Sequence, residues 1–113
     1  MTPYDVVLVP FPFTDLRATK RRPCLVLAMA EPAGMPVHFI AAMITSQTDR
    51  RFPHDVVLGD AKAAGLVKAS LVRLFKVVTL DETLVPRRLG RLTAPDQAAV
   101  AAALTAMFGS EGG

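Results

Sequence analysis

The chain has 113 residues, of which 51% are hydrophobic and 20% charged, and it carries a net charge of +3. This size and composition predict one folded domain over residues 1–113 and exclude a disordered chain, while the mild basicity is compatible with a polyanionic partner. The longest apolar runs, VVLVPFPF and FIAAMI, are far shorter than the roughly 20 residues that cross a bilayer, and no export signal is visible, so we expect a cytoplasmic protein without membrane contact.

Five segments predict short strands, because they are rich in apolar and β-branched residues and are bounded by turn or polar residues. In chain order they are YDVVLVPF (4–11), PCLVLAMA (23–30), MPVHFIAAMIT (35–45), HDVVL (54–58) and ASLVRLFKVVTL (69–80). Pro10 and Pro12 lack the backbone N–H that a sheet requires, so the first strand should end, bulge or lie at an edge there. Residues 59–66 could hold a helical turn that Gly65 ends. The spacing favours a barrel or sandwich over alternating strands and helices.

The segment TAPDQAAVAAALTAMFG (93–109) predicts a helix. Thr93 suits the N-cap, with Asp96 as a capping-box-like partner, and Gly109 is a suitable stop. Four apolar side chains recur at helical spacing and should form one stripe that packs on the sheet or on a partner. They are Val100, Leu104, Met107 and Phe108.

Residues that usually bind metals or act as nucleophiles are sparse. His38, His54 and Cys24 are separated by long intervals, so their spacing does not resemble a zinc site, and no Gly-rich phosphate-binding sequence occurs. Cys24 lies in the apolar run PCLVLAM, which favours a small buried side chain over a reactive thiol. We therefore expect neither a metal nor a nucleotide cofactor.

A basic loop, FTDLRATKRRP (13–23), lies between the first two predicted strands. Arg22 is its most constrained cation, because Pro23 biases it towards extended backbone and so presents its guanidinium at the mouth of a strand. The other cations are interpreted as loop charges that steer and bind phosphate groups. They are Arg17, Lys20 and Arg21.

A second polar segment, MITSQTDRRF (43–52), follows an apolar strand. Thr45 comes directly after the apolar residues, so its hydroxyl can stand at the end of the strand. Taken alone this is an ordinary polar strand terminus, and it gains significance only if it faces Arg22. The polar side chains that would then extend the site are Ser46, Gln47, Arg50 and Arg51.

Five segments taken together resemble the MazF/PemK toxins of bacterial toxin–antitoxin pairs. They are DVVLVPFPFTDL, KRRPCLVL, MITSQ, ASLVRLFKVVTLD and RRLGRL, in the family's order over residues 4–108. The resemblance implies a mainly β (α+β) fold, an SH3-like barrel of short antiparallel strands with a C-terminal helix. It also implies a homodimer that is a sequence-specific, metal-independent endoribonuclease acting on single-stranded RNA such as mRNA, and that is neutralised by an acidic antitoxin. Two positions depart from the family pattern: Tyr4, where a Gly is usual, and Cys24, where a small apolar residue is common.

The resemblance further implies that Arg22 and Thr45 are the catalytic pair. RNA supplies its own nucleophile, the 2′-OH beside the scissile phosphate, so the enzyme must position the phosphate and neutralise its charge. A guanidinium stays protonated and its donors match phosphate oxygens, so Arg22 should stabilise charge rather than act as a base. The general base stays open between His38 and a water molecule.

Eight further side chains are expected to bind RNA: Arg17, Lys20, Arg21, Ser46, Gln47, Arg50, Arg51 and Arg73. For Arg73, in the strand sequence LVRLF, two interpretations stay open: it supports the site or the dimer surface, or it is a solvated strand charge.

Two other functions are compatible with the fold. One is inhibition of DNA gyrase without RNA cleavage, as in CcdB toxins, and the other is that of an inactive antitoxin- or RNA-binding homologue. The presence of both Arg22 and Thr45 favours the ribonuclease.

Overall fold

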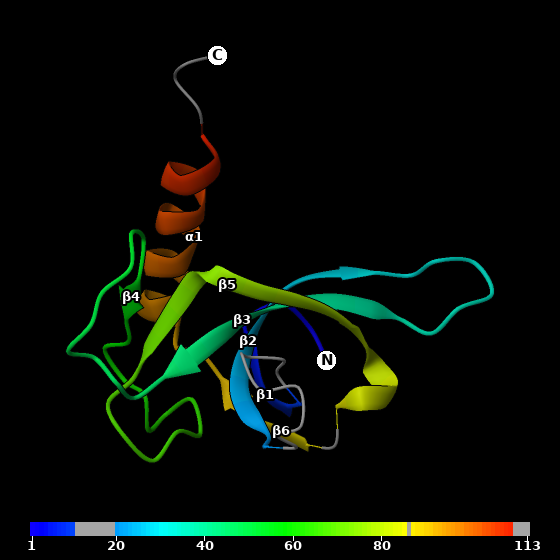
Figure 1. Cartoon of the computed structure of the whole chain (residues 1–113), viewed down its shortest axis with the longest axis horizontal. Coiled ribbons are helices and arrows are strands. Elements are labelled where there is room, and N and C mark those ends of the chain that lie inside the picture. The colour runs from blue at the N-terminus through cyan, green and yellow to red at the C-terminus, as the bar shows by residue number, and fades with distance from the viewer. Residues whose placement is uncertain (11–19, 86, 110–113) are drawn as a thin grey trace.

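Six antiparallel strands form one curled sheet in the computed structural model, which describes residues 1–10, 20–85 and 87–109 (Figure 1). The elements are β1 (Asp5–Val9), β2 (Arg22–Ala30), β3 (His38–Thr45), β4 (Val56–Val57), β5 (Leu71–Asp81), the 3-10 turn η1 (Glu82–Leu84), β6 (Arg87–Arg91) and helix α1 (Ala94–Phe108). The strand order is β4-β5-β3-β2-β1-β6, and every neighbouring pair is antiparallel. The curled sheet is a half-barrel, and the predicted fold class is confirmed.

The five predicted strands are present, and a sixth was missed. β1 ends at Val9, directly before Pro10, as the missing N–H of proline requires. β6 has the sequence RRLGR, in which three arginines obscure the apolar alternation that marks a strand. Within residues 59–66 the structure has hydrogen-bonded turns over 61–65 and no assigned helix: Ala64 N–H donates to the Ala61 carbonyl at 3.1 Å and Gly65 N–H to the Lys62 carbonyl at 3.0 Å.

Alternate residues of the strands build two cores, one on each face of the sheet. Val6 and Leu25 belong to the core that helix α1 covers, together with Val100 of the helix. Their neighbours Val7 and Cys24 point to the other face, into the core enclosed by the curl of the sheet. Both faces of the central strands are therefore buried, which accounts for the near-continuous apolar sequence of β1 and β2.

Helix α1 stands against the part of the sheet near β4 (Figure 1). Thr93 is its N-cap but makes no side-chain capping bond, and Asp96 instead accepts the backbone N–H groups of Gly59 at 2.8 Å and Asp60 at 3.1 Å. The expected capping box is thus wrong, and Asp96 anchors the loop that leads from β4 to β5. In the predicted apolar stripe, Phe108 is 73% exposed and does not share the burial of Val100. Among the helices that the structure describes, none has the length and hydropathy needed to span a membrane.

The N-terminal segment is held by unusual backbone geometry at Tyr4, whose φ is 73°. Glycine adopts this left-handed region freely, whereas a residue with a Cβ does so at a cost in free energy. Two hydrogen bonds compensate: the Tyr4 N–H donates to the Val26 carbonyl at 2.8 Å, and the Tyr4 carbonyl accepts from Leu92 N–H at 3.1 Å. Tyr4 therefore adopts the backbone conformation that suits a Gly. The Tyr that replaces the family's usual Gly does not displace the start of β1.

Candidate functional site

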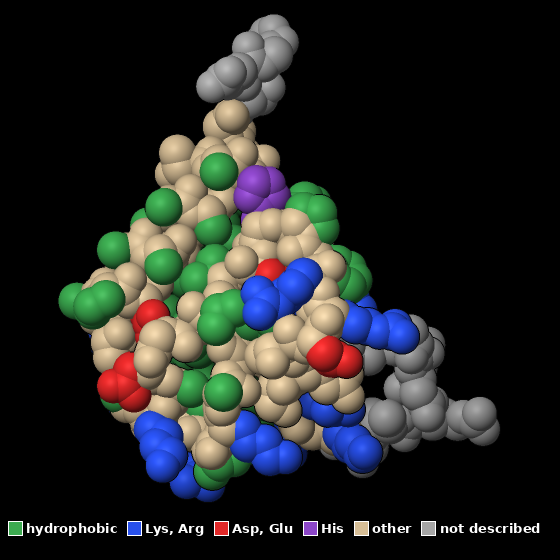
Figure 2. All heavy atoms as spheres, turned by 90° about the vertical axis from the view of Figure 1, so that its left-hand side faces the viewer, with side chains coloured by type: hydrophobic (Ala, Val, Ile, Leu, Met, Phe, Trp, Pro, Cys, Tyr) green, Lys and Arg blue, Asp and Glu red, His purple; other side chains and the backbone are tan. Residues whose placement is uncertain are grey.

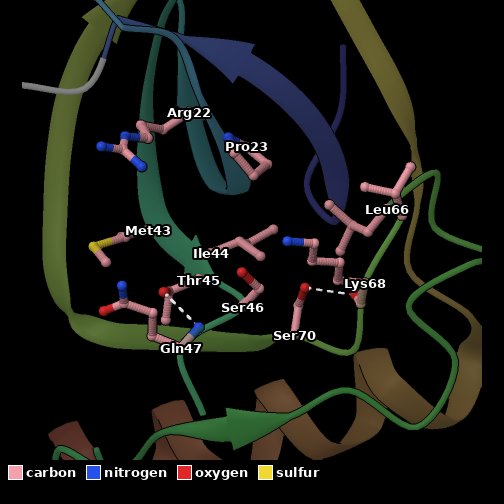
Figure 3. Close-up of a pocket in the computed structure, with 11 residues that line it drawn as sticks. Arg22, Pro23, Met43, Ile44, Thr45, Ser46, Gln47, Leu66, Lys68 and Ser70 are labelled. Carbon is pink, nitrogen blue, oxygen red and sulfur yellow. Dashed lines mark hydrogen bonds between the residues drawn. The ribbon is translucent and has the colours of Figure 1, made fainter.

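Arg22 and Thr45 lie at adjacent strand ends, because β2 begins at Arg22 and β3 ends at Thr45. The two strands are antiparallel, with Cys24 paired to Met43. Continuing this register by two residues sets Arg22 across from Thr45, and directly opposed side chains of an antiparallel pair point to the same face. Both residues line one pocket of about 340 Å³ (Figure 3). The structure thus brings together the two residues that the sequence predicted as a pair.

Three segments line this pocket: the start of β2, the end of β3 with the residues after it, and the loop before β5. The lining residues are Arg22, Pro23, Met43, Ile44, Thr45, Ser46, Gln47, Leu66, Val67, Lys68 and Ser70. Arg22 lies at one end and Lys68 at the other (Figure 3). Val67 is 88% exposed and offers an uncovered apolar side chain at the rim. A cation at each end with apolar and hydroxyl groups between them suits a ligand that carries both phosphates and flat bases.

Two hydroxyl groups of the pocket, those of Thr45 and Ser70, have defined hydrogen-bond partners. Thr45 Oγ1 accepts the backbone N–H of Gln47 at 3.1 Å, which leaves the hydroxyl hydrogen of Thr45 available for donation into the pocket (Figure 3). Ser70 Oγ donates to the backbone carbonyl of Lys68 at 2.8 Å and so fixes the chain that carries the lysine. Thr45 can therefore hydrogen-bond an anionic oxygen without losing the contact that orders its own turn.

Cys24 lies next to the pocket but faces the core. It is fully buried, and burial raises the pKa of its thiol to about 12. Its Sγ lies 3.7 Å from the carbonyl oxygen of Arg22, to which the thiol donates. A thiol that stays protonated at neutral pH is a poor nucleophile. Cys24 is therefore a small apolar side chain in the core, two residues after Arg22 on β2.

The expected RNA-binding cations occupy different settings. Lys20 and Arg21 are exposed directly before β2, and Arg50 and Arg51 are exposed on the loop after β3, whereas Arg17 lies outside the described residues. Figure 2 shows Lys and Arg side chains gathered along the lower edge of the face that carries β4 and α1, with few Asp and Glu side chains among them. This part of the surface carries a positive potential.

Arg73 is not a solvated strand charge, because its residue is only 6% exposed. Its Nη2 donates to the Arg50 carbonyl oxygen at 2.8 Å and to Asp55 Oδ2 at 3.0 Å, and its Nε donates to Asp55 Oδ1 at 3.3 Å. Its Cζ lies 4.3 Å from the centroid of the Phe52 ring. The guanidinium is therefore engaged with the loop that follows β3, which agrees with a supporting role and argues against a direct contact with RNA.

His38 does not belong to the pocket. It begins β3, whereas Thr45 ends it, and the eight residues of this strand separate the two by roughly 23 Å at about 3.3 Å per residue. Its Nδ1 lies 2.8 Å from the carbonyl oxygen of Pro36, at the end of β3 opposite to Thr45. The suggestion that His38 acts as the general base in this pocket is thus wrong.

Sequence reasoning missed Lys68 and Ser70. Neither stands in a recognisable motif, since LVKAS reads as an ordinary polar loop before a strand. Their place in the pocket depends on how the loop between β4 and β5 packs. The only sequence feature that pointed to the loop as part of the site was the isolated cation Lys68.

Comparison with family models identifies one family. A family model described as a PemK-like, MazF-like toxin of a type II toxin–antitoxin system matches residues 2–108. No curated protein matches the chain in sequence.

Solved structures share the fold at low sequence identity. An endoribonuclease in complex with its cognate antitoxin, from a mycobacterial species, is 20% identical with a TM-score of 0.69, covering 96% of this chain and 95% of that one. The Mycobacterium tuberculosis toxin MazF-mt6 is 22% identical with a TM-score of 0.68, covering 95% and 98%. A MazE–MazF complex from Deinococcus radiodurans is 23% identical with a TM-score of 0.68, covering 98% and 97%.

Proposed function

The chain belongs to the family of PemK-like, MazF-like toxins of type II toxin–antitoxin systems, and we propose that it cleaves single-stranded RNA as the toxin of such a pair. The observation that carries this proposal is the position of Arg22 across from Thr45 in one pocket, at the ends of β2 and β3. Two solved structures that share the fold are an endoribonuclease in complex with its cognate antitoxin and a MazE–MazF complex. Cellular mRNA as the substrate would place the protein in the cytoplasm.

The reaction uses the nucleophile that RNA carries. The 2′-oxygen forms a bond to the adjacent phosphorus as the bond to the 5′-oxygen breaks, giving a 2′,3′-cyclic phosphate and a new 5′-OH. Negative charge builds on the non-bridging oxygens, where the planar guanidinium of Arg22 supplies two parallel donors. The free hydroxyl hydrogen of Thr45 donates to the same phosphate and fixes its orientation.

Two protons move in this reaction. With His38 at the far end of β3, water is the acceptor that we propose for the proton of the 2′-OH. Arg22 lies close to the reacting phosphate in this arrangement and can donate a proton towards the leaving 5′-oxygen. The step needs no metal-bound water, because the substrate brings its own hydroxyl.

The exposed cations around the pocket bind the RNA backbone in this proposal. Lys20 and Arg21 lie on the Arg22 side, Arg50 and Arg51 lie on the loop after β3, and Lys68 lies at the opposite end of the pocket. Contacts to phosphates release counterions, so binding should weaken as salt rises. Unpaired bases can then meet Gln47 and the apolar rim, as single-stranded RNA exposes edges and faces that a duplex hides.

An antitoxin and a second copy of the chain are the proposed protein partners. An acidic antitoxin segment that folds on binding could cover the basic surface and block the pocket. The homodimer is supported by apolar side chains that the isolated chain leaves in water, among them Phe75 and Val77 of β5, which are 52% and 50% exposed.

The direct test is to incubate the purified protein with a long single-stranded RNA in buffer containing EDTA. We expect cleavage by the wild type, and a loss of at least about 100-fold in the rate for Arg22→Ala, because one charge-stabilising donor group in an active site contributes about that much. Thr45→Val should also lose activity, whereas Thr45→Ser keeps the hydroxyl and should retain most of it. Equal cleavage by wild type and Arg22→Ala would overturn the assignment. No cleavage by any of them, together with inhibition of DNA gyrase, would favour the CcdB-like function instead.

A further inference from the structure

The loop between β3 and β4, residues 46–55, carries several of the side chains proposed to bind RNA, yet its own short-range contacts are few. Gln47 N–H donates to Thr45 Oγ1, Arg51 Nε donates to the Thr48 carbonyl oxygen at 2.8 Å, and Phe52 N–H donates to Asp55 Oδ2 at 2.8 Å. Each of these bonds joins residues two or three apart. Local turns of this kind shape the loop without fixing its place against the sheet.

Side chains of β5 supply that fixation: Lys76 and Phe75 contact the rings of Phe52 and His54, and Arg73 makes hydrogen bonds to the loop. Arg73 binds the loop at two separated points, the backbone carbonyl of Arg50 and the carboxylate of Asp55, while the Phe52 ring lies over its guanidinium. Side-chain exposures of 7% for Arg73 and 3% for Asp55 show that this ion pair is shielded from solvent. Shielded, charge-assisted pairs with more than one hydrogen bond hold their geometry better than exposed ones.

The sheet register connects Arg73 to the pocket. β3 and β5 pair Met43 with Arg73, and directly opposed side chains point to the same face of the sheet. Met43 lines the pocket two residues before Thr45. The anchor of the loop thus stands on the strand beside the proposed catalytic threonine and on the same face.

We propose that Arg73 is a positioning residue, which clamps the 46–55 loop to β5 so that the exposed Arg50 and Arg51 meet the phosphates of bound RNA. This inference rests on the proposed ribonuclease function. It gives Arg73 no contact with the substrate, because its donors face Asp55 and the Arg50 carbonyl oxygen. Loss of the clamp should weaken RNA binding while the chemistry at Arg22 and Thr45 continues once the pocket is saturated.

The test compares the wild type with Arg73→Lys, which keeps the charge but cannot supply the fork that reaches both loop partners. The probe is an RNA oligonucleotide with a 2′-deoxy nucleotide at the cut position found for the wild type, and its affinity is measured over a range of salt concentrations. We expect affinity to fall by about tenfold, and the slope of log K against log salt to shrink by about 0.7 for each phosphate contact that the loop loses. On the cleavable RNA, KM should rise while kcat stays within about twofold of the wild type.

Asp55→Asn is the second variant, and it separates the clamp from a direct contact. If Arg73 itself touched RNA, removing the neighbouring negative charge would strengthen binding. The clamp predicts the opposite, a weaker affinity and a shallower slope, although Arg73 is unchanged. The matched control is Arg88→Lys, the same exchange at an exposed arginine on β6, at the other end of the strand order, and it should leave the affinity and the slope unchanged.

Three further results test whether Arg73 clamps the loop. Arg50→Ala with Arg51→Ala should cost affinity in the wild type and little in the Arg73→Lys background, since cations on a displaced loop no longer contribute. An unchanged slope in both Arg73→Lys and Asp55→Asn, with the wild type binding RNA, would overturn the clamp and leave the ribonuclease proposal standing. A wild type that neither cuts nor binds RNA would overturn both.

Discussion

At the residue scale, Pro23 links a local backbone preference to the proposed chemistry. It restricts the backbone of Arg22 and lines the pocket beside it, while the register of β2 against β3 sets Thr45 opposite. The proline singles out Arg22 as the most constrained cation of its loop. The pairing of Arg22 with Thr45 was implied by the family resemblance, and the register of β2 against β3 sets the two residues across from each other.

The buried carboxyl of Asp5 predicts how the free energy of unfolding depends on pH. Burial raises the pKa of this carboxyl, but the Thr2 N–H and the guanidinium groups of Arg91 and Arg88 outweigh burial, so the net pKa is lowered. A carboxyl with a lowered folded-state pKa stabilises the protein above its unfolded pKa of about 3.9, and this contribution disappears as pH falls through the folded value. Asp5→Asn should therefore lower the free energy of unfolding at pH 7 by about 1–2 kcal/mol, since both arginines are partly exposed and solvent weakens the pairs.

Urea unfolding at several pH values measures this effect. The gap between wild type and Asp5→Asn should be constant from pH 7 to about pH 5, and it should shrink as pH falls below the unfolded pKa of about 3.9 and through the lower folded-state pKa, as the wild-type carboxyl becomes protonated. Asp49→Asn, at an exposed position, serves as the control and should stay within about 0.5 kcal/mol of the wild type. A gap that persists unchanged to pH 2 would show that the charge of Asp5 is not its source.

At the element scale, the loop between β4 and β5 reaches the pocket because two glycines let backbones touch. A Cβ on Gly90 of β6 would lie 2.4 Å from the carbonyl oxygen of Ala64, and a Cβ on Gly65, whose φ is 87°, would lie 2.1 Å from the carbonyl oxygen of Leu89. The loop that continues to Lys68 therefore packs directly on β6. Any side chain at this contact must push the loop away from the sheet.

Gly90→Ala tests this packing. The clash is with backbone rather than with a flexible side chain, so we expect a loss of about 1–3 kcal/mol in the free energy of unfolding. We also expect weaker RNA binding, because Lys68 moves with the loop. Gly34→Ala is the matched control: its φ of 73° is unfavourable for alanine, but a Cβ there meets nothing within 4 Å, and the β2–β3 turn lies far from the pocket. It should cost stability without changing RNA binding, and an equal loss of binding in both variants would refute the packing argument.

Strand composition and the C-terminal helix were predictable from sequence, and the loops were not. β1, β2, β3 and β5 carry long apolar runs that permit few other structures, whereas β6 holds three arginines and pairs with β1 through a bulge between Val6 and Val7. Lys68 reaches the pocket because Gly65 lets its loop pack on β6. Arg73 can be buried because it pairs with Asp55, eighteen residues earlier in the chain. Contacts of this kind depend on tertiary packing, which periodicity does not encode.

At the scale of the whole molecule, we propose the outer edge of β5 as the surface that binds a second copy. β4 pairs only with Leu71 and Val72, so most of the eleven residues of β5 have no strand on that side within the described chain. Phe75 and Val77 lie on this stretch and are half exposed, and unpaired apolar strands of this kind favour association.

The double variant Phe75→Ser, Val77→Ser should therefore convert a homodimer into a monomer in sedimentation velocity experiments. Met35→Ser is the control, since Met35 is similarly exposed but lies in the β2–β3 turn. It should leave the dimer intact. A wild type that sediments as a monomer at the concentrations used would refute the homodimer, and a double variant that remains dimeric would move its interface elsewhere.

The pocket that holds Arg22 and Thr45 is proposed to cleave RNA through the 2′-OH of the substrate. This proposal is tested most directly with two RNA oligonucleotides that differ only in a single 2′-deoxy nucleotide on the 5′ side of the mapped cut. We predict that the wild type binds both with similar affinity, cuts only the unmodified one in the presence of EDTA, and leaves a 2′,3′-cyclic phosphate and a 5′-OH. Cleavage of the 2′-deoxy oligonucleotide at the same position would rule out the 2′-OH as the nucleophile.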